Sequence, residues 1–234
     1  EEIARAFIAK SVYNIQTTRD LIDRLKNDRT LRILCGWRYK SNIPSESKFS
    51  RVFKELSVLQ IAAKTHERFV KEYLEHTIFF YNATDATKIP LRVKPVKAKK
   101  EPIPKNKRGR PKKGETPFSK KPTILQQQRT MTTTKEMLSL VSTKCGVGVK
   151  QNSKGNREVW IGGKLHISAV DGDIPITAFY SGANIHDSSV ALPLMNETSQ
   201  RVSYLYDLQD AGYDSNNIRD FSKKLNHRPL IDIN

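Results

Sequence analysis

The sequence predicts an α/β protein with a mixed sheet and flanking helices, preceded by an all-α module and interrupted by a basic insert. Three observations lead to this fold class. The first third of the 234-residue chain repeats apolar side chains at helical spacing. Short apolar runs rich in β-branched and aromatic residues follow, separated by turn residues. Between these two regions lies a stretch of lysine, arginine and proline that cannot form a core. We expect the helical module at 1–76, the α/β domain at 77–234 and a largely flexible insert at 91–156.

The charge balance predicts a polyanionic partner. The chain holds 41 Lys and Arg against 24 Asp and Glu, a formal net charge of +17, and this excess favours nucleic acid. No apolar run approaches the roughly 20 residues of a membrane-spanning helix, so we expect no membrane partner. Cys35 and Cys145 lie far apart and have no His or Cys nearby at ligand spacing. This usage fits a reducing compartment and predicts no zinc site.

The helical module has features of a DNA-reading domain. Apolar residues recur at helical spacing in two stretches, Ile3, Phe7, Ile8 and Val12, and then Leu21, Ile22 and Leu25. Thr18 is a plausible cap for the second helix, and Ser45 or Ser47 for a later helix that carries Lys48 and Arg51 on its polar face. A basic helix after a tight turn is compatible with a helix-turn-helix reading head, but a solvated helix face explains the same pattern.

Two predicted strands each deliver an aspartate. Thr77–Tyr81 has the composition of a buried strand and leads to Asp85, and Val202–Leu208 leads to Asp210 in a glycine turn. Neighbouring strands lie roughly 4.8 Å apart and paired catalytic metals about 3.5–4 Å apart. The two carboxylates could therefore share Mg²⁺.

The remaining elements complete the α/β layout. We expect a hairpin of strands at 159–169 and 174–180, a helix through Met195 with His186 or Asp187 at its cap, a helix at 135–141, a helix at 216–225 and a last strand at 229–233. Three leading strands followed by alternating helices and strands is the layout of a ribonuclease-H-like sheet.

The basic insert contains a short motif, Lys107-Arg108-Gly109-Arg110-Pro111-Lys112. Arg-Gly-Arg-Pro flanked by lysines resembles an AT-hook. The glycine lets the backbone run deep in a narrow minor groove, where the arginines meet its negative potential. A basic linker that holds phosphates without selection is the alternative, and a nuclear-localisation signal is a weaker one.

Several segments resemble bacterial insertion-sequence transposases of the DDE type, in the right order along nearly the whole chain. They are Asp85-Ala86-Thr87, Trp160 to His166, Ser181 to Ser188, Asp210 to Ser215 and Pro229 to Asp232, with Leu34 to Trp37 and Pro44 to Glu46 in the helical module. The resemblance implies that Asp85 and Asp210 are the first and second catalytic aspartates. It implies a third acid, a glutamate on a helix beyond Asn234. We therefore expect a chain cut before this residue and inactive alone.

Other polar residues near these segments have competing interpretations. Asp207 is the alternative second ligand, although strand alternation puts it on the opposite face from Asp210. Asp214 is expected to cap the next helix, and His227 to lie at the surface. A further group could contact DNA or orient a ligand, or serve only the strand and the cap: Lys164, His166, His186 and Asp187.

The resemblance implies metal-dependent DNA strand cleavage and strand transfer at element ends, with Mg²⁺ or Mn²⁺ as cofactor. The expected partners are double-stranded DNA, AT-rich at the hook, and further copies of the chain. The expected location is the bacterial cytoplasm, associated with the nucleoid. Two alternatives remain: a non-catalytic architectural protein that binds AT-rich DNA, and a structure-selective nuclease of the same fold.

Overall fold

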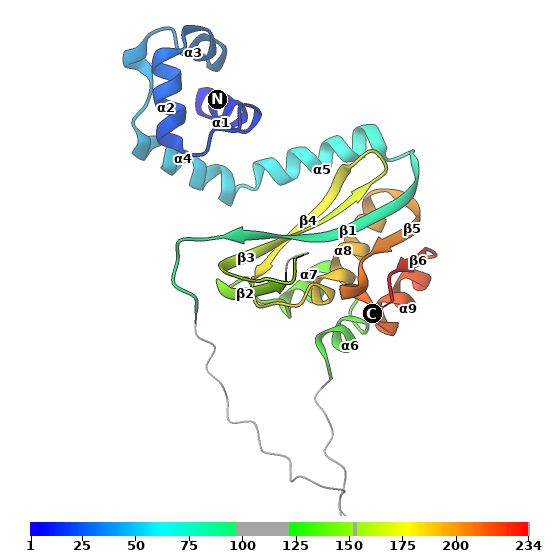
Figure 1. Ribbon diagram of the computed structural model, residues 1–234. Helices are drawn as coiled ribbons and strands as arrows, with labels where there is room; N and C mark the ends of the chain where they lie inside the picture. Colours follow the sequence, from blue (N-terminus) through cyan, green and yellow to red (C-terminus); the bar gives the residue numbers. More distant parts are fainter. Residues whose placement is uncertain (97–121, 152–153, 234) are drawn as a thin grey trace, which may run out of the picture. The chain divides into compact units, whose positions relative to one another are not determined.

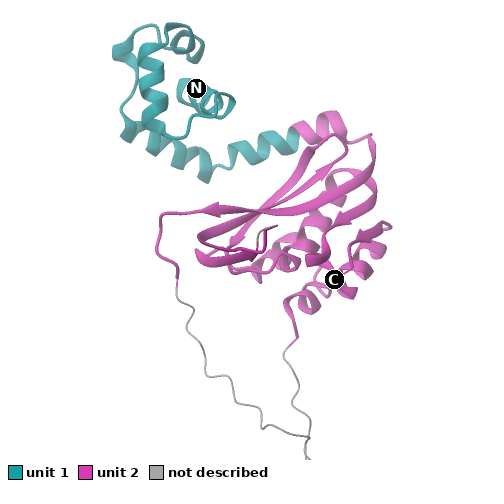
Figure 2. Ribbon diagram, in the orientation of Figure 1, with its two compact units in different colours: residues 1–68 teal, residues 69–234 magenta. Residues whose placement is uncertain are grey.

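The computed structural model describes residues 1–96, 122–151 and 154–233. The chain forms two compact units, Glu1–Arg68 and Phe69–Asn234 (Figure 2). Each unit has its own core.

The first unit is helical, as predicted. Its elements are α1 (Glu2–Val12), α2 (Thr18–Asn27), α3 (Arg29–Cys35), a 3-10 turn η1 (Lys40–Asn42), α4 (Glu46–Val58) and the beginning of α5 (Ile61–Leu74). Thr17 caps α2, because its hydroxyl accepts a hydrogen bond from the Asp20 N–H at 3.1 Å. The expected cap, Thr18, is the first helical residue instead. Gly36 ends α3 with a φ of 107°, a conformation that favours glycine.

The core of the first unit joins α1 to α4. Leu21, Leu25 and Phe49 are fully buried. The Phe49 ring makes aromatic contacts with Phe7 at a centroid distance of 5.8 Å and with Trp37 at 6.0 Å. These contacts between α1, α4 and the segment after α3 hold the helices as one body.

The second unit contains a six-stranded mixed sheet among its described residues. The strands are β1 (Ile78–Pro90), β2 (Gly146–Gln151), β3 (Arg157–Val170), β4 (Ile174–Gly182), β5 (Ser203–Gln209) and β6 (Arg228–Ile231). They follow the order β2-β3-β1-β5-β6, and β4 pairs with β3 (Figure 1). β1 is antiparallel to β3 and parallel to β5, and β5 is parallel to β6. The carboxyl ends of β1, β5 and β6 therefore point the same way.

The helices of the second unit are α6 (Ile124–Gln128), α7 (Thr134–Ser139), α8 (Ser188–Arg201), a 3-10 turn η2 (Ala211–Tyr213) and α9 (Asn216–Lys224). A core cluster joins α7, α8, α9 and β6 through Met137, Leu192, Ile218 and Ile231. No helix in the described residues is long and apolar enough to cross a membrane.

β1 is longer than the sequence indicated. It continues through Asp85 to Pro90, because Asn82 to Pro90 pair with β3 on the other side of the strand. The parallel pairing with β5 ends at Thr84. Asp85 thus follows the parallel segment but lies inside the strand.

Part of the predicted insert is ordered. Thr123 and Thr133 each form a capping box, which begins α6 and α7. Residues 146–151, expected to be flexible, form the edge strand β2 against β3. The expectation of a flexible 91–156 is wrong for 122–151.

The division between the units also falls earlier than the predicted 76/77. Val70 and Leu74, near the end of α5, pack against Phe79 of β1 and Val202 before β5. The last turns of α5 therefore belong to the α/β unit.

Candidate functional site: three aspartates at the ends of parallel strands

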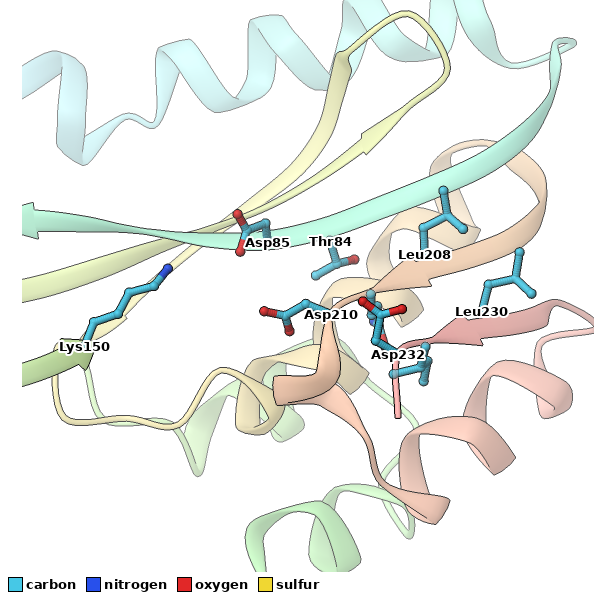
Figure 3. Close-up of a pocket in the computed structure, with 9 residues that line it drawn as sticks. Thr84, Asp85, Lys150, Leu208, Asp210, Leu230 and Asp232 are labelled. Carbon is cyan, nitrogen blue, oxygen red and sulfur yellow. The ribbon is translucent and has the colours of Figure 1, made fainter. Parts of the chain in front are cut away.

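Three aspartates occupy equivalent places on β1, β5 and β6. Ala83 pairs with Leu208, and Leu208 pairs with Leu230. Asp85, Asp210 and Asp232 each follow this row by two residues, so strand alternation directs them to the same face of the sheet. All three are exposed. In Figure 3 the Asp210 side chain lies between those of Asp85 and Asp232.

Local backbone contacts orient two of these carboxylates. Asp85 Oδ1 accepts a hydrogen bond from the Ala86 N–H at 2.6 Å, and Asp210 Oδ1 accepts one from the Gly212 N–H at 3.0 Å. A Cβ on residue 212 would lie 3.0 Å from Asp210 Oδ1. The glycine in this turn therefore leaves room for the carboxylate.

The three aspartates line one pocket of about 670 Å³. Its other lining residues are Thr84, Lys150, Leu208, Gln209, Leu230 and Ile231. The Lys150 side chain extends from β2 toward Asp85 (Figure 3). The pocket lining thus contains three carboxylates and one ammonium group.

Two buried polar side chains in this pocket lack hydrogen-bond partners. Gln209 is 7% exposed, and neither its Nε2 nor its Oε1 has a partner. The Thr84 hydroxyl, on a residue 4% exposed, also has none. An unpartnered buried polar group costs about 1–3 kcal/mol. These atoms are shielded from solvent, so a ligand could contact them only after a local rearrangement.

Tyr213 is a buried residue of the 3-10 turn that follows Asp210. It is 1% exposed and its hydroxyl has no partner within hydrogen-bond distance. Burial, with the negative charges of Asp187, Asp85 and Asp210, raises the pKa of this hydroxyl far above its usual range. The hydroxyl therefore stays protonated.

Lys164, Asp187 and His166 form a second polar cluster beside the site. Lys164 Nζ donates to Asp187 Oδ1 at 2.8 Å and to the Ile185 carbonyl at 3.0 Å. His166 is fully buried, with Nε2 2.8 Å from Ser181 Oγ. Burial lowers the pKa of His166 to about 4, although Asp187 opposes this shift. These residues join β3 and β4 to the start of α8, where Asp187, one of the two expected cap residues, is at the N-cap position without a side-chain cap hydrogen bond.

Asp207, the alternative ligand, is engaged elsewhere. Its carboxylate is fully buried, accepts a hydrogen bond from Ser222 Oγ at 2.6 Å and from Asn82 Nδ2 at 3.4 Å, and lies 3.5 Å from His227 Nδ1. These partners place it under α9, away from the pocket that Asp210 lines. The expected opposite orientation of the two aspartates is therefore observed.

Two of the expectations for neighbouring residues were wrong. Asp214 does not cap α9: Ser215 does, and Asp214 forms an ion pair with Arg219 at 2.8 Å. The His227 side chain is only 8% exposed and stacks on Tyr204 at a centroid distance of 3.9 Å. It is a core side chain because Asp207 and Tyr204 enclose it.

The predicted DNA contacts are distributed over separate places. Lys48 and Arg51 are exposed on α4, on the face opposite the buried Phe49. The motif Lys107, Arg108, Gly109, Arg110, Pro111 and Lys112 lies outside the described residues. Lys150, which sequence reasoning did not select, is the cation at the pocket.

The pocket's donors fit a hard divalent cation. Carboxylate, amide and hydroxyl oxygens are the ligands that Mg²⁺ and Mn²⁺ prefer. No group of three or more His, Cys, Asp or Glu side chains in the described ranges is close enough to hold one ion.

Comparison with known proteins gives one match. Residues 1–55 match the family described as a transposase domain, DUF772. No curated protein and no solved structure matches the chain. The match suggests a transposase role and an enzyme family that processes DNA.

Proposed function

We propose that the protein is a DDE-type DNA transposase that cleaves DNA strands at element ends and transfers them, using Mg²⁺ or Mn²⁺. The observation that carries the proposal is the row of aspartates at the ends of adjacent parallel strands, in a chain whose first 55 residues match a transposase domain. The sheet order, with β1 antiparallel to β3 and parallel to β5, supports the ribonuclease-H-like fold that the sequence layout predicts.

Each side chain has a role in this proposal. Asp85 and Asp210 would hold the divalent cations, which when bound would supply Lewis-acid chemistry to the attacking and leaving oxygens. Lys150 contacts the negatively charged phosphate from the opposite wall of the pocket. Lys48 and Arg51 contact the DNA backbone.

An architectural protein would not need this site. Three carboxylates within one pocket repel phosphates unless cations neutralise them, and a protein that only holds DNA gains nothing from them. The aspartate row therefore favours catalysis over the architectural alternative.

Metal-dependent cleavage tests the proposed function, measured with the chain extended through the downstream helix and glutamate that the family resemblance implies. The substrate is a supercoiled plasmid carrying the genomic sequences that flank the coding region. We expect nicked or linear products with 3′-hydroxyl ends in Mg²⁺ or Mn²⁺, and none in EDTA. Absence of products in both metals, or products that persist in EDTA, would contradict the proposal.

We also propose that the Arg108-Gly109-Arg110 motif binds the minor groove of AT-rich DNA. Replacing Arg108 and Arg110 with Ala should weaken binding to an AT-rich duplex by about 1–3 kcal/mol per lost contact and affect a GC-rich duplex less. Fluorescence anisotropy at fixed salt measures both affinities. Equal losses on the two duplexes would leave only phosphate binding, because phosphates carry no sequence information.

A further inference from the structure

We propose that Asp171 is a positioning residue of this site, because its carboxylate fixes an irregularity in β1 that turns Asp85 toward the pocket. The inference rests on the proposed function, which gives Asp85 its role. Asp171 lies in the turn between β3 and β4 and does not line the pocket. It would therefore act on the chemistry only through the direction of another side chain.

The order of buried side chains shows where β1 departs from a regular strand. Phe79, Asn82 and Thr84 are buried, at a spacing of three residues and then two. The side chains of a regular strand repeat every two residues. Phe79 and Asn82 nevertheless face the same side, since Val170 pairs with Asn82 and packs in one buried cluster with Phe79. The side-chain alternation of β1 is therefore broken between these two positions.

β5 has the same break next to that of β1. Tyr204 and Asp207 are buried three residues apart. The His227 ring stacks on the Tyr204 ring at a centroid distance of 3.9 Å, and its Nδ1 lies 3.5 Å from Asp207 Oδ2, so both residues are on one side of β5. The pairing of the two strands keeps one register on both sides of the break. The irregularity is therefore shared by the two strands.

The break decides which way the strand-end aspartates point. If β1 alternated strictly from Phe79, Asp85 would face the buried side and Asn82 the pocket side. The same count from Tyr204 would direct Asp210 to the buried side. Because the break shifts the alternation by one residue, Asp85 and Asp210 instead line the pocket. Bulges beside active sites re-aim side chains in this way.

The Asp171 carboxylate binds the broken segment of β1 directly. Its Oδ2 accepts a hydrogen bond from the Phe80 N–H at 2.6 Å, and its Oδ1 accepts one from the Tyr81 N–H at 3.0 Å. Successive N–H groups of a regular strand point to opposite edges, so one carboxylate reaches both where the strand is irregular. The pairing of β1 with β3 begins at the next residue, Asn82, opposite Val170. Asp171 therefore holds the break where this pairing starts.

Thiol labelling with a maleimide measures which side of β1 is accessible. The parent chain carries Cys35→Ala and Cys145→Ser, which remove its two cysteines, and either Asp85→Cys or Thr84→Cys as the single thiol. In this parent Asp85→Cys should react quickly, whereas Thr84→Cys should be protected because residue 84 is buried. Adding Asp171→Ala should raise the labelling rate at position 84 by about tenfold or more and lower the rate at position 85 by about twofold or more, since neighbouring positions exchange sides.

Two further variants show what the carboxylate contributes. Asp171→Asn keeps one carbonyl oxygen but loses the second acceptor atom, so its labelling rates should lie between those of the parent and of Asp171→Ala. Asp173→Asn is the matched control, because Asp173 is an exposed residue of the same turn with a φ of 59°, which asparagine tolerates. It should label like the parent at both positions. Circular dichroism verifies that each variant is folded, and if Asp171→Ala does not fold, Asp171→Asn provides the test.

The outcomes separate the inference from the function on which it rests, because labelling needs neither DNA nor metal. A rise at position 84 with a fall at position 85 supports the inference. Any other pattern overturns it and leaves the proposed function standing: a rise at both positions means that the strand has only loosened, and unchanged rates mean that the break does not depend on Asp171.

Cleavage then tests the link to the chemistry. In the extended chain with its native Asp85, Asp171→Ala should lower the cleavage rate by at least the factor seen for labelling at position 85. If the labelling changes as expected but this variant cleaves DNA like the wild type, the direction of Asp85 does not matter for cleavage. In that case the role that the proposed function gives to Asp85 fails, and with it the positioning role of Asp171.

Discussion

Replacing Asp210 with Asn is expected to lower the rate of DNA strand cleavage by about 10³-fold or more, and Asp85→Asn should have a similar effect. Removing a charged metal ligand removes several kcal/mol of transition-state stabilisation, and a loss of about 4 kcal/mol lowers the rate constant about 10³-fold. Single-turnover nicking of the plasmid substrate in saturating Mn²⁺ measures this loss.

Matched variants make the result specific. Asp214→Asn removes the same charge close to Asp210, but Asp214 pairs with Arg219 and does not line the pocket. It should cleave at close to the wild-type rate. Since Asp85 and Asp210 are exposed, their replacement should leave the melting temperature without metal nearly unchanged. Cleavage by Asp210→Asn at the rate of Asp214→Asn would show that another group holds the metal.

Much of the α/β unit was predictable because its elements carry local signals. β3, β4, β5 and β6 appear close to their predicted bounds, since each is an apolar run between turn residues. α8 begins after Asp187, one of its two expected cap residues, because cap preferences are also local in sequence. The second unit also has the mixed sheet with helices that the sequence of element types predicted.

The edge strand β2 was missed because glycine occurs both in flexible segments and in strands where other groups approach the backbone closely. Gly146 and Gly148 lie within the stretch that was expected to be flexible. In the structure a Cβ on Gly148 would lie 2.3 Å from the Trp160 ring, and one on Gly146 would lie 2.1 Å from Asn184 Oδ1. Both glycines therefore allow close packing within the sheet, a requirement set by residues distant in sequence.

The position of Asp232 at the pocket and the burial of His227 could not be read from the sequence for a related reason. Their surroundings depend on which strands are neighbours and in which register, and the local sequence does not contain that information. Asp232 follows a strand of only four residues, so no local pattern distinguished it from a loop aspartate. A search for acids two residues beyond the aligned apolar row of Ala83, Leu208 and Leu230 would have found it.

Asp207 differs from Asp210, because its carboxylate stabilises the fold and does not take part in the proposed chemistry. Asp207→Ala should lower the free energy of unfolding of the α/β unit by on the order of 3 kcal/mol, because Ser222 and Asn82 would lose their shared acceptor in a buried place. Ser222→Ala should cost only about 1 kcal/mol, since Asp207 would keep its hydrogen bond from Asn82.

Urea unfolding of the α/β unit alone measures these differences. The chain has two tryptophans, Trp37 in the helical unit and Trp160 on β3. In a Trp37→Phe background, Trp160 fluorescence therefore reports only on the α/β unit. The effect of Mn²⁺ is compared under conditions where each variant is folded. Asp207→Ala should be stabilised by Mn²⁺ as much as the Trp37→Phe parent is. Asp210→Asn should have the stability of this parent without metal but lose most of the stabilisation by Mn²⁺. If Asp207→Ala were as stable in urea as its parent but were no longer stabilised by Mn²⁺, Asp207 would be the metal ligand and not the structural carboxylate.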